Sequence, residues 1–67
     1  MNWNLEGLRV VGKYLDTYDV VGRVDLSRVK YGGSVEHHIA LDFPIEVYGV
    51  DRERVIIDHR DVAKICS

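Results

Sequence analysis

The sequence predicts an all-β fold, a small barrel of five strands, from three observations. β-Branched and aromatic residues recur in short runs that glycine and aspartate interrupt, which is typical of strands. Helical periodicity is poor along the whole chain. A chain of 67 residues has room for one thin core, so we expect a single domain over residues 1–67.

Five strands are expected along the chain. The first covers about residues 8–15 and turns back at residues 16–19. The second covers about residues 20–31, which is long for a strand, so we expect it to bend. The third ends at Phe43-Pro44, and a fourth segment at residues 45–48 leads through a charged turn at 50–53 to a strand at 54–58. A short helical turn at residues 59–61 then precedes a brief last strand at 62–65.

Gly32-Gly33 gives the strongest local signal, because two adjacent residues free to adopt positive φ suit a two-residue type I′ hairpin turn. With Tyr31 facing Ser34, apolar residues of the two long strands meet on one face. The expected core pairs are Leu26 with Ile39, Val24 with Leu41, and Gly22 with Phe43. The expected pairs on the other face are Ser27 with His38, Asp25 with Ala40, and Arg23 with Asp42.

A long bent hairpin, a further hairpin and a short 3-10 turn before the last strand resemble the layout of SH3-like small barrels. Closure of the barrel would remove the exposed edges that a flat sheet leaves. An OB-like barrel fits less well, because it usually needs more residues and a true helix. Many unrelated functions share such barrels, so the layout does not identify a function.

The candidates for a metal site are His37, His38, His59 and Asp58. Adjacent residues on a strand point to opposite faces, so His37 and His38 are not expected to hold one ion. His37 follows the core phase of its strand, but the expected register sets it opposite Arg28, beyond the end of the barrel. We interpret the histidines as surface or barrel-end residues and predict no metal and no cofactor.

The sequence also predicts no catalytic site. A general acid and base must converge in a cleft, whereas the carboxylates of this chain are spread over its turns. Ser27 and Ser34 lack the glycine elbow and the neighbouring histidine that nucleophilic serines use. We interpret Ser27 opposite His38 as a chance cross-strand pair and expect a protein that is not an enzyme.

The charge pattern does not favour a general nucleic-acid-binding surface. The net charge is −2, and the nine basic residues are interspersed with eleven acidic ones. The strongest signal of this kind lies along the long hairpin, at Arg23, Arg28, Lys30 and Tyr31, where cations accompany a ring on which bases can stack. A nucleic-acid-binding accessory or regulatory protein is therefore the alternative hypothesis.

Protein interaction is the leading hypothesis, because apolar side chains occupy both phases of the strands. Four of them, Val11, Leu15, Val21 and Ile56, sit on the phase that faces outward. A domain this small often gains stability by oligomerising, so we expect a protein partner or a homo-oligomer with these residues at its interface. Trp3, which precedes the first strand, is expected to cover the open end of the barrel.

A cytoplasmic location is expected from three absences in the sequence. Cys66 has no partner cysteine in the chain, which favours a reducing compartment. The chain shows neither a signal-peptide pattern nor an apolar run long enough to span a membrane, so no membrane partner is expected.

Overall fold

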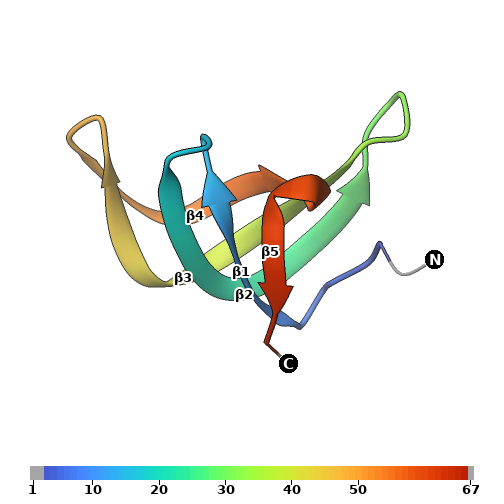
Figure 1. The fold of residues 1–67 in the computed structure, drawn as a ribbon, viewed down its shortest axis with the longest axis horizontal. Helices are drawn as coiled ribbons and strands as arrows, with labels where there is room; N and C mark the ends of the chain where they lie inside the picture. The colour runs from blue at the N-terminus through green and yellow to red at the C-terminus, as the bar shows by residue number, and fades with distance from the viewer. Residues whose placement is uncertain (1–2, 67) are drawn as a thin grey trace.

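Five antiparallel strands form one sheet, with the spatial order β4-β3-β2-β1-β5 (Figure 1). The computed structural model describes residues 3–66, so Met1, Asn2 and Ser67 lie outside it. The elements are β1 (Arg9–Tyr14), β2 (Tyr18–Val29), β3 (Val35–Val47), β4 (Val50–Asp58), the 3-10 turn η1 (His59–Asp61) and β5 (Val62–Ile65). Within residues 3–66, no helix has the length and apolar character needed to cross a membrane. The all-β prediction of five strands with a short 3-10 turn is confirmed.

Hydrogen bonds do not close the sheet into a barrel, since β4 and β5 are its two edges. The sheet instead curls until β1 packs on the end of β4 and on η1. A Cβ atom at Gly12 of β1 would lie 2.7 Å from the Asp61 carbonyl oxygen and 2.8 Å from Ile57 Cδ1. Gly12 therefore allows a backbone approach that any larger residue would obstruct. The interior of the curled sheet holds the core residues Leu5, Val10, Val20, Val24, Ile39, Val55 and Ile57.

Inside the hydrogen-bonded pair Lys30 and Ser34, the loop between β2 and β3 has three residues, not the two that the glycine pair predicts. The Lys30 amide donates to the Ser34 carbonyl at 2.7 Å, and the Gly33 amide donates to the Lys30 carbonyl at 2.9 Å. Gly32 and Gly33 both adopt positive φ, at 100° and 93°. Both glycines therefore adopt the positive φ that was expected of them. Tyr31, however, lies in the loop, so the strands next to it pair one residue away from the expected register.

A β-bulge at Asp25 changes the register of β2 and β3 a second time. Leu26 lies opposite His38, whereas Val24 lies opposite Ile39, so Asp25 has no partner on β3. Such an extra residue reverses the faces of the strand that follows it. Val24 still points into the core as expected, but Leu26 points outward and is 43% exposed.

The other expected pairs on this hairpin are also wrong. Gly22 lies opposite Leu41, Ser27 opposite His37 and Arg23 opposite Ala40. Asp42 forms its ion pair with Arg9 of β1.

Two further turns differ from the expected ones. The turn between β3 and β4 consists of Tyr48 and Gly49, both at positive φ, and the expected turn at residues 50–53 is part of β4. The turn after β1 begins at Leu15, which also has positive φ, instead of at Asp16. β3 continues through Pro44, where its pairing with β4 is interrupted between Ala40 and Ile45.

Replacing Gly33 with valine is expected to destabilise the protein by about 1–2 kcal/mol, because a β-branched residue resists positive φ. A Cβ atom at this position meets nothing within 4 Å, so the backbone conformation alone is tested. Urea or thermal unfolding measures the effect, and Ser34→Val, at a neighbouring exposed position without positive φ, is the matched control. Equal stability of the two variants would contradict the loop geometry.

The segment that precedes β1 forms a strap along β2. We call residues 3–8 the N-terminal strap. It runs along β2 beyond Arg23, the residue at which the pairing of β2 with β1 ends. The Gly7 amide donates to the Val24 carbonyl and the Val24 amide donates to the Leu8 carbonyl, both at 2.8 Å. The strap thus covers the edge of β2 that β1 leaves open.

Candidate functional site: a buried serine and two histidines

The shift in register brings Ser27 of β2 directly opposite His37 of β3, instead of the predicted His38. Both side chains point into the interior: Ser27 is 5% exposed and His37 is fully buried. The prediction that His37 lies beyond the end of the barrel, opposite Arg28, is wrong. Because the loop contains one more residue than expected and the bulge reverses β2, a polar pair occupies the core next to Val24 and Ile39.

A chain of hydrogen bonds links these two residues to η1. Ser27 Oγ lies 2.7 Å from His37 Nδ1, and His37 Nε2 lies 2.8 Å from His59 Nδ1. The two imidazole rings are inclined to each other, with their centroids 5.0 Å apart. η1 therefore places His59 as the outer, half-buried member of the chain.

The strap closes the inner end of this chain. The Leu5 amide donates to Ser27 Oγ at 3.0 Å, and the Ser27 amide donates to Glu6 Oε2 at 2.9 Å. Leu5 itself is 3% exposed and belongs to the core. Ser27 is thus bonded to the strap through both its backbone amide and its hydroxyl oxygen.

These contacts favour one placement of the hydrogen atoms when both rings are neutral. Ser27 Oγ already accepts the Leu5 amide hydrogen, so its own hydrogen is best donated to His37 Nδ1. His37 then carries its hydrogen on Nε2 and donates it to His59 Nδ1. In this arrangement every polar atom between Leu5 and His59 has a partner, which a buried network requires. We assign these tautomers from the network.

Burial lowers the pKa of the His37 imidazole below its usual value, and the neighbouring His59 lowers it further. Asp58, at the end of β4, acts in the opposite direction because its carboxylate favours the charged ring. His37 is thus held neutral, as its two hydrogen bonds require.

The order of the three side chains is that of a nucleophile, a base and a positioning group, yet the surroundings differ from those of a hydrolase. A serine nucleophile needs access to substrate and nearby donors for the developing oxyanion. Ser27 lies beneath the strap, and the amide that reaches its oxygen bonds to the serine itself. The arrangement of Ser27, His37 and His59 is that of a polar cluster whose members satisfy one another inside a small core.

The two histidines at adjacent positions on β3 were considered as metal ligands. His37 and His38 do point to opposite faces, as predicted from adjacent positions on a strand. Within residues 3–66, no three histidine, cysteine or acidic side chains come together as a metal site would require.

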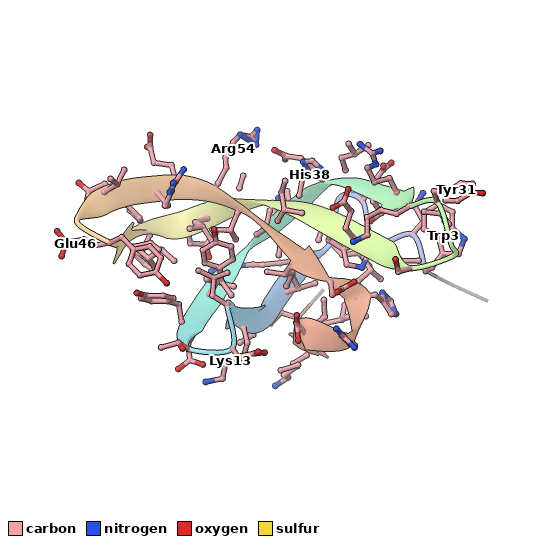
Figure 2. The ribbon with its side chains drawn as sticks, turned by 90° about the horizontal axis from the view of Figure 1, so that it is seen from above. Trp3, Lys13, Tyr31, His38, Glu46 and Arg54 are labelled. Atoms are coloured by element: carbon pink, nitrogen blue, oxygen red, sulfur yellow. The ribbon has the colours of Figure 1, made fainter. Side chains whose placement is uncertain are left out.

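The outer face of β2, β3 and β4 carries a row of apolar side chains around His38. Leu26 lies opposite His38, and His38 lies opposite Ile56. Leu26 and Ile56 are 43% and 50% exposed. His38 and Arg54 project from the same side of the sheet (Figure 2). We call Leu26, His38 and Ile56 the outer-face row, and it lines a groove of about 500 Å³ together with Arg54 and other residues of β1, β2 and β4.

The four expected interface residues fall into two pairs. Val11 lies opposite Val21 in the pairing of β1 with β2, and both are half-buried. Leu15 and Ile56, each about half exposed, line a second groove of about 400 Å³ between the β1–β2 turn and β4. Leu26, which was expected in the core, is the interface candidate that the sequence did not reveal. Trp3 is half-buried in the strap, at the end of the molecule opposite Glu46 (Figure 2).

The residues of the nucleic-acid hypothesis lie along β2 and its loop but do not form a free basic surface. Arg28 pairs with Glu36 at 3.3 Å, and Arg23 donates to the Gly7 carbonyl at 2.8 Å. Lys30 is half-buried, and its backbone amide donates a hydrogen bond to the Ser34 carbonyl. Tyr31 at the tip of the loop is fully exposed.

Comparisons of this chain with protein-family models, with curated proteins and with solved structures find no match.

Proposed function

We propose that this protein is a non-catalytic assembly module with an SH3-like barrel layout, which binds a second copy of itself through the outer-face row. The observation that carries the proposal is the row itself, in which Leu26 and Ile56 expose apolar side chains across three adjacent strands. Exposed apolar groups that gather beside a groove are typical of interaction sites. The strand order and the 3-10 turn before β5 support the SH3-like layout.

The charges on either side of the row favour a second copy as the partner. Toward the β2–β3 loop, the next residues on this face are Arg28, Glu36 and Asp58. On the other side they are Arg23, Ala40 and Arg54, together with the bulge residue Asp25, whose carboxylate pairs with Arg54. One flank therefore has a net negative charge and the other a net positive charge. If two copies pack face to face with the two-fold axis along the row, the acidic flank of each meets the basic flank of the other.

The free edge of β4 disfavours a different mode of self-association, in which the sheets of two copies join edge to edge. An antiparallel pair of identical strands has its two-fold axis perpendicular to the sheet, so only residues on the same face oppose each other. The charges along β4 alternate in sign at Asp51, Arg52, Glu53 and Arg54. Symmetric pairing centred on this segment would bring like charges together in every register, which is destabilising. The outer face is thus the more favourable surface for a second copy.

Leu26→Glu is expected to abolish self-association, because it places a carboxylate in the apolar centre of the interface. Light scattering during gel filtration, over a range of concentrations, should show a dimer for the wild-type protein and a monomer for the variant. Val29→Glu is the matched control, because Val29 lies on the same strand at 47% exposure but outside the row. A wild-type protein that stays monomeric at high concentration, or a Val29→Glu variant that dissociates equally, would contradict the proposal.

Nucleic-acid binding remains a second candidate on one observation, the full exposure of the Tyr31 ring next to Lys30. Bases can stack on such a ring while a cation contacts the phosphates. Absorbance at 260 nm that elutes with the protein and disappears in high salt would support this candidate over self-assembly.

We also propose a cytoplasmic location, because Cys66 is a free, exposed thiol in this structure.

A further inference from the structure

The hydrogen-bond chain connects the protein surface to the attachment of the strap. Its outer member, His59, borders two shallow clefts, one along β5 and one beside the β2–β3 loop. Its inner member, Ser27, holds the Leu5 amide of the strap. A proton that arrives at His59 therefore acts on a network that ends at Leu5.

Protonation of His59 reverses the direction of every hydrogen bond in the chain. The charged ring carries hydrogen on both nitrogens, so His59 Nδ1 becomes a donor to His37 Nε2. The hydrogen of His37 must then move to Nδ1, from which it is donated to Ser27 Oγ. The serine oxygen now receives hydrogens from both His37 and Leu5, and its own hydrogen loses its acceptor.

The reversed network is unsatisfied at its inner end. Within residues 3–66, His37 is the one acceptor in contact with the Ser27 hydroxyl. A buried hydroxyl without an acceptor is unfavourable, and rotation of the hydroxyl toward another partner gives up the bond to Leu5. If both rings are protonated, two N–H groups face each other between His37 and His59, and that contact is also lost.

We propose that the Ser27, His37 and His59 chain is an acid-sensitive latch, which holds the N-terminal strap on β2 at neutral pH and releases it when the histidines are protonated. The strap is the part that yields, because it is bonded to β2 alone, whereas β3 is paired on both sides. Its release uncovers the edge of β2 from Val24 to Ser27 and withdraws Leu5 from the core. The latch operates within one chain and does not depend on self-assembly.

Several charged groups surround the hydrogen-bond chain of Ser27, His37 and His59 and influence its response to pH. Glu6 approaches from the strap, Asp58 from β4, Arg60 and Asp61 from η1, and Lys64 from β5. Asp58 pairs with Arg60 at 3.7 Å, which reduces the support that its carboxylate gives to a charged histidine. Glu6 accepts the hydrogen of the Ser27 amide and so joins the strap to the inner end of the same network.

The direction of the response follows from the buried ring. His37 prefers its neutral form in the latched state, because burial and the adjacent His59 both lower its pKa. A state in which the strap is released and the ring is hydrated binds protons more readily. Latching is therefore favoured above the ordinary histidine pKa of about 6.5 and is lost as the pH falls below it.

Amide hydrogen exchange tests the latch residue by residue. Between pH 7.5 and pH 5, protection of the Leu5 and Ser27 amides, corrected for the intrinsic rate, should fall at least tenfold. Protection of Ile39, in the centre of the sheet, should stay at least tenfold above that of Leu5 over the same range. Fluorescence of Trp3, the single tryptophan, reports release of the strap independently. Equal protection at Leu5 and Ile39 would mean that Leu5 exchanges only by global unfolding and would overturn the proposal, as would no loss at Leu5.

Three variants separate the latch from a general effect of acid. His59→Asn keeps an acceptor near the Nδ1 position but has no ring to protonate, so the fall in Leu5 protection should shrink to the part that the buried His37 supplies. His38→Asn removes a histidine that lies outside the hydrogen-bond chain, on the outer face, and should keep the wild-type fall in Leu5 protection whatever its effect on self-association. Ser27→Ala removes the acceptor and should leave Leu5 unprotected at both pH values. A pH response as large in His59→Asn as in the wild type would overturn the proposal even if the strap does open.

Discussion

Replacing Gly22 with alanine is expected to destabilise the protein by about 3 kcal/mol or more, which is comparable to the whole stability of a domain of this size. A Cβ atom on Gly22 would overlap the Ala40 carbonyl oxygen and would lie 2.7 Å from Ile39 Cγ2. The obstructing atom belongs to the backbone of the adjacent strand, so no change of rotamer can relieve the contact. Equilibrium unfolding in urea measures the loss, and most of the variant is expected to be unfolded at 25 °C.

The reason for this sensitivity is the bend of β2, which follows the curl of the sheet (Figure 1). Gly22 lies opposite Val10 on β1 and opposite Leu41 on β3, so it is flanked by a paired strand on each side. Gly7→Ala is the matched control, because a Cβ atom on Gly7 would meet nothing within 4 Å, although the residue adopts a φ of 85°. It should cost only about 1 kcal/mol, from backbone conformation alone. Similar losses at Gly22 and Gly7 would contradict the close approach.

The strand pattern allowed the fold class to be predicted, but not the register. Alternation of apolar residues correctly placed Gly22 and Val24 of β2 and Ile39 of β3 toward the interior. The register depended on the length of one loop, and a glycine pair fits both a two-residue turn and a three-residue loop. The bulge at Asp25 leaves no signal in the alternation of apolar residues. Ser27 then takes the buried position that the sequence pattern assigns to Leu26.

The buried histidine was partly visible in the sequence. His37 follows the alternation of its strand and shares the core phase of Ile39, which predicts burial. The expected register placed it past the end of the core, since a histidine with no visible partner is costly to bury. Its partners come from β2 and from η1, which are 10 and 22 residues away in the chain. Only the three-dimensional arrangement shows that both ring nitrogens are bonded.

Replacing His37 with leucine is expected to destabilise the protein by about 2–3 kcal/mol at pH 8, although leucine is apolar and similar in size. The loss arises because the Ser27 hydroxyl keeps its buried position without an acceptor. Ser27→Ala should cost about 1–2 kcal/mol, because the Leu5 amide loses its partner. In a double-mutant cycle the two losses should not add, since the double variant has no stranded hydroxyl, and the coupling should be at least about 1 kcal/mol. Additive losses would show that Ser27 and His37 do not act as a pair.

The pH dependence of the same variant provides an independent measurement. Burial holds the pKa of His37 below its value in the unfolded chain, so the unfolded chain takes up the proton first as the pH falls. The stability that neutral His37 supplies is fully present above the unfolded-state pKa of about 6.5 and is lost as the pH falls below it toward the lowered pKa of the folded state. Leucine does not titrate, so the difference in stability between the wild type and His37→Leu should narrow between pH 8 and pH 5. A constant difference across that range would mean that the ring is retained for its shape and packing, and that its proton does not couple to folding.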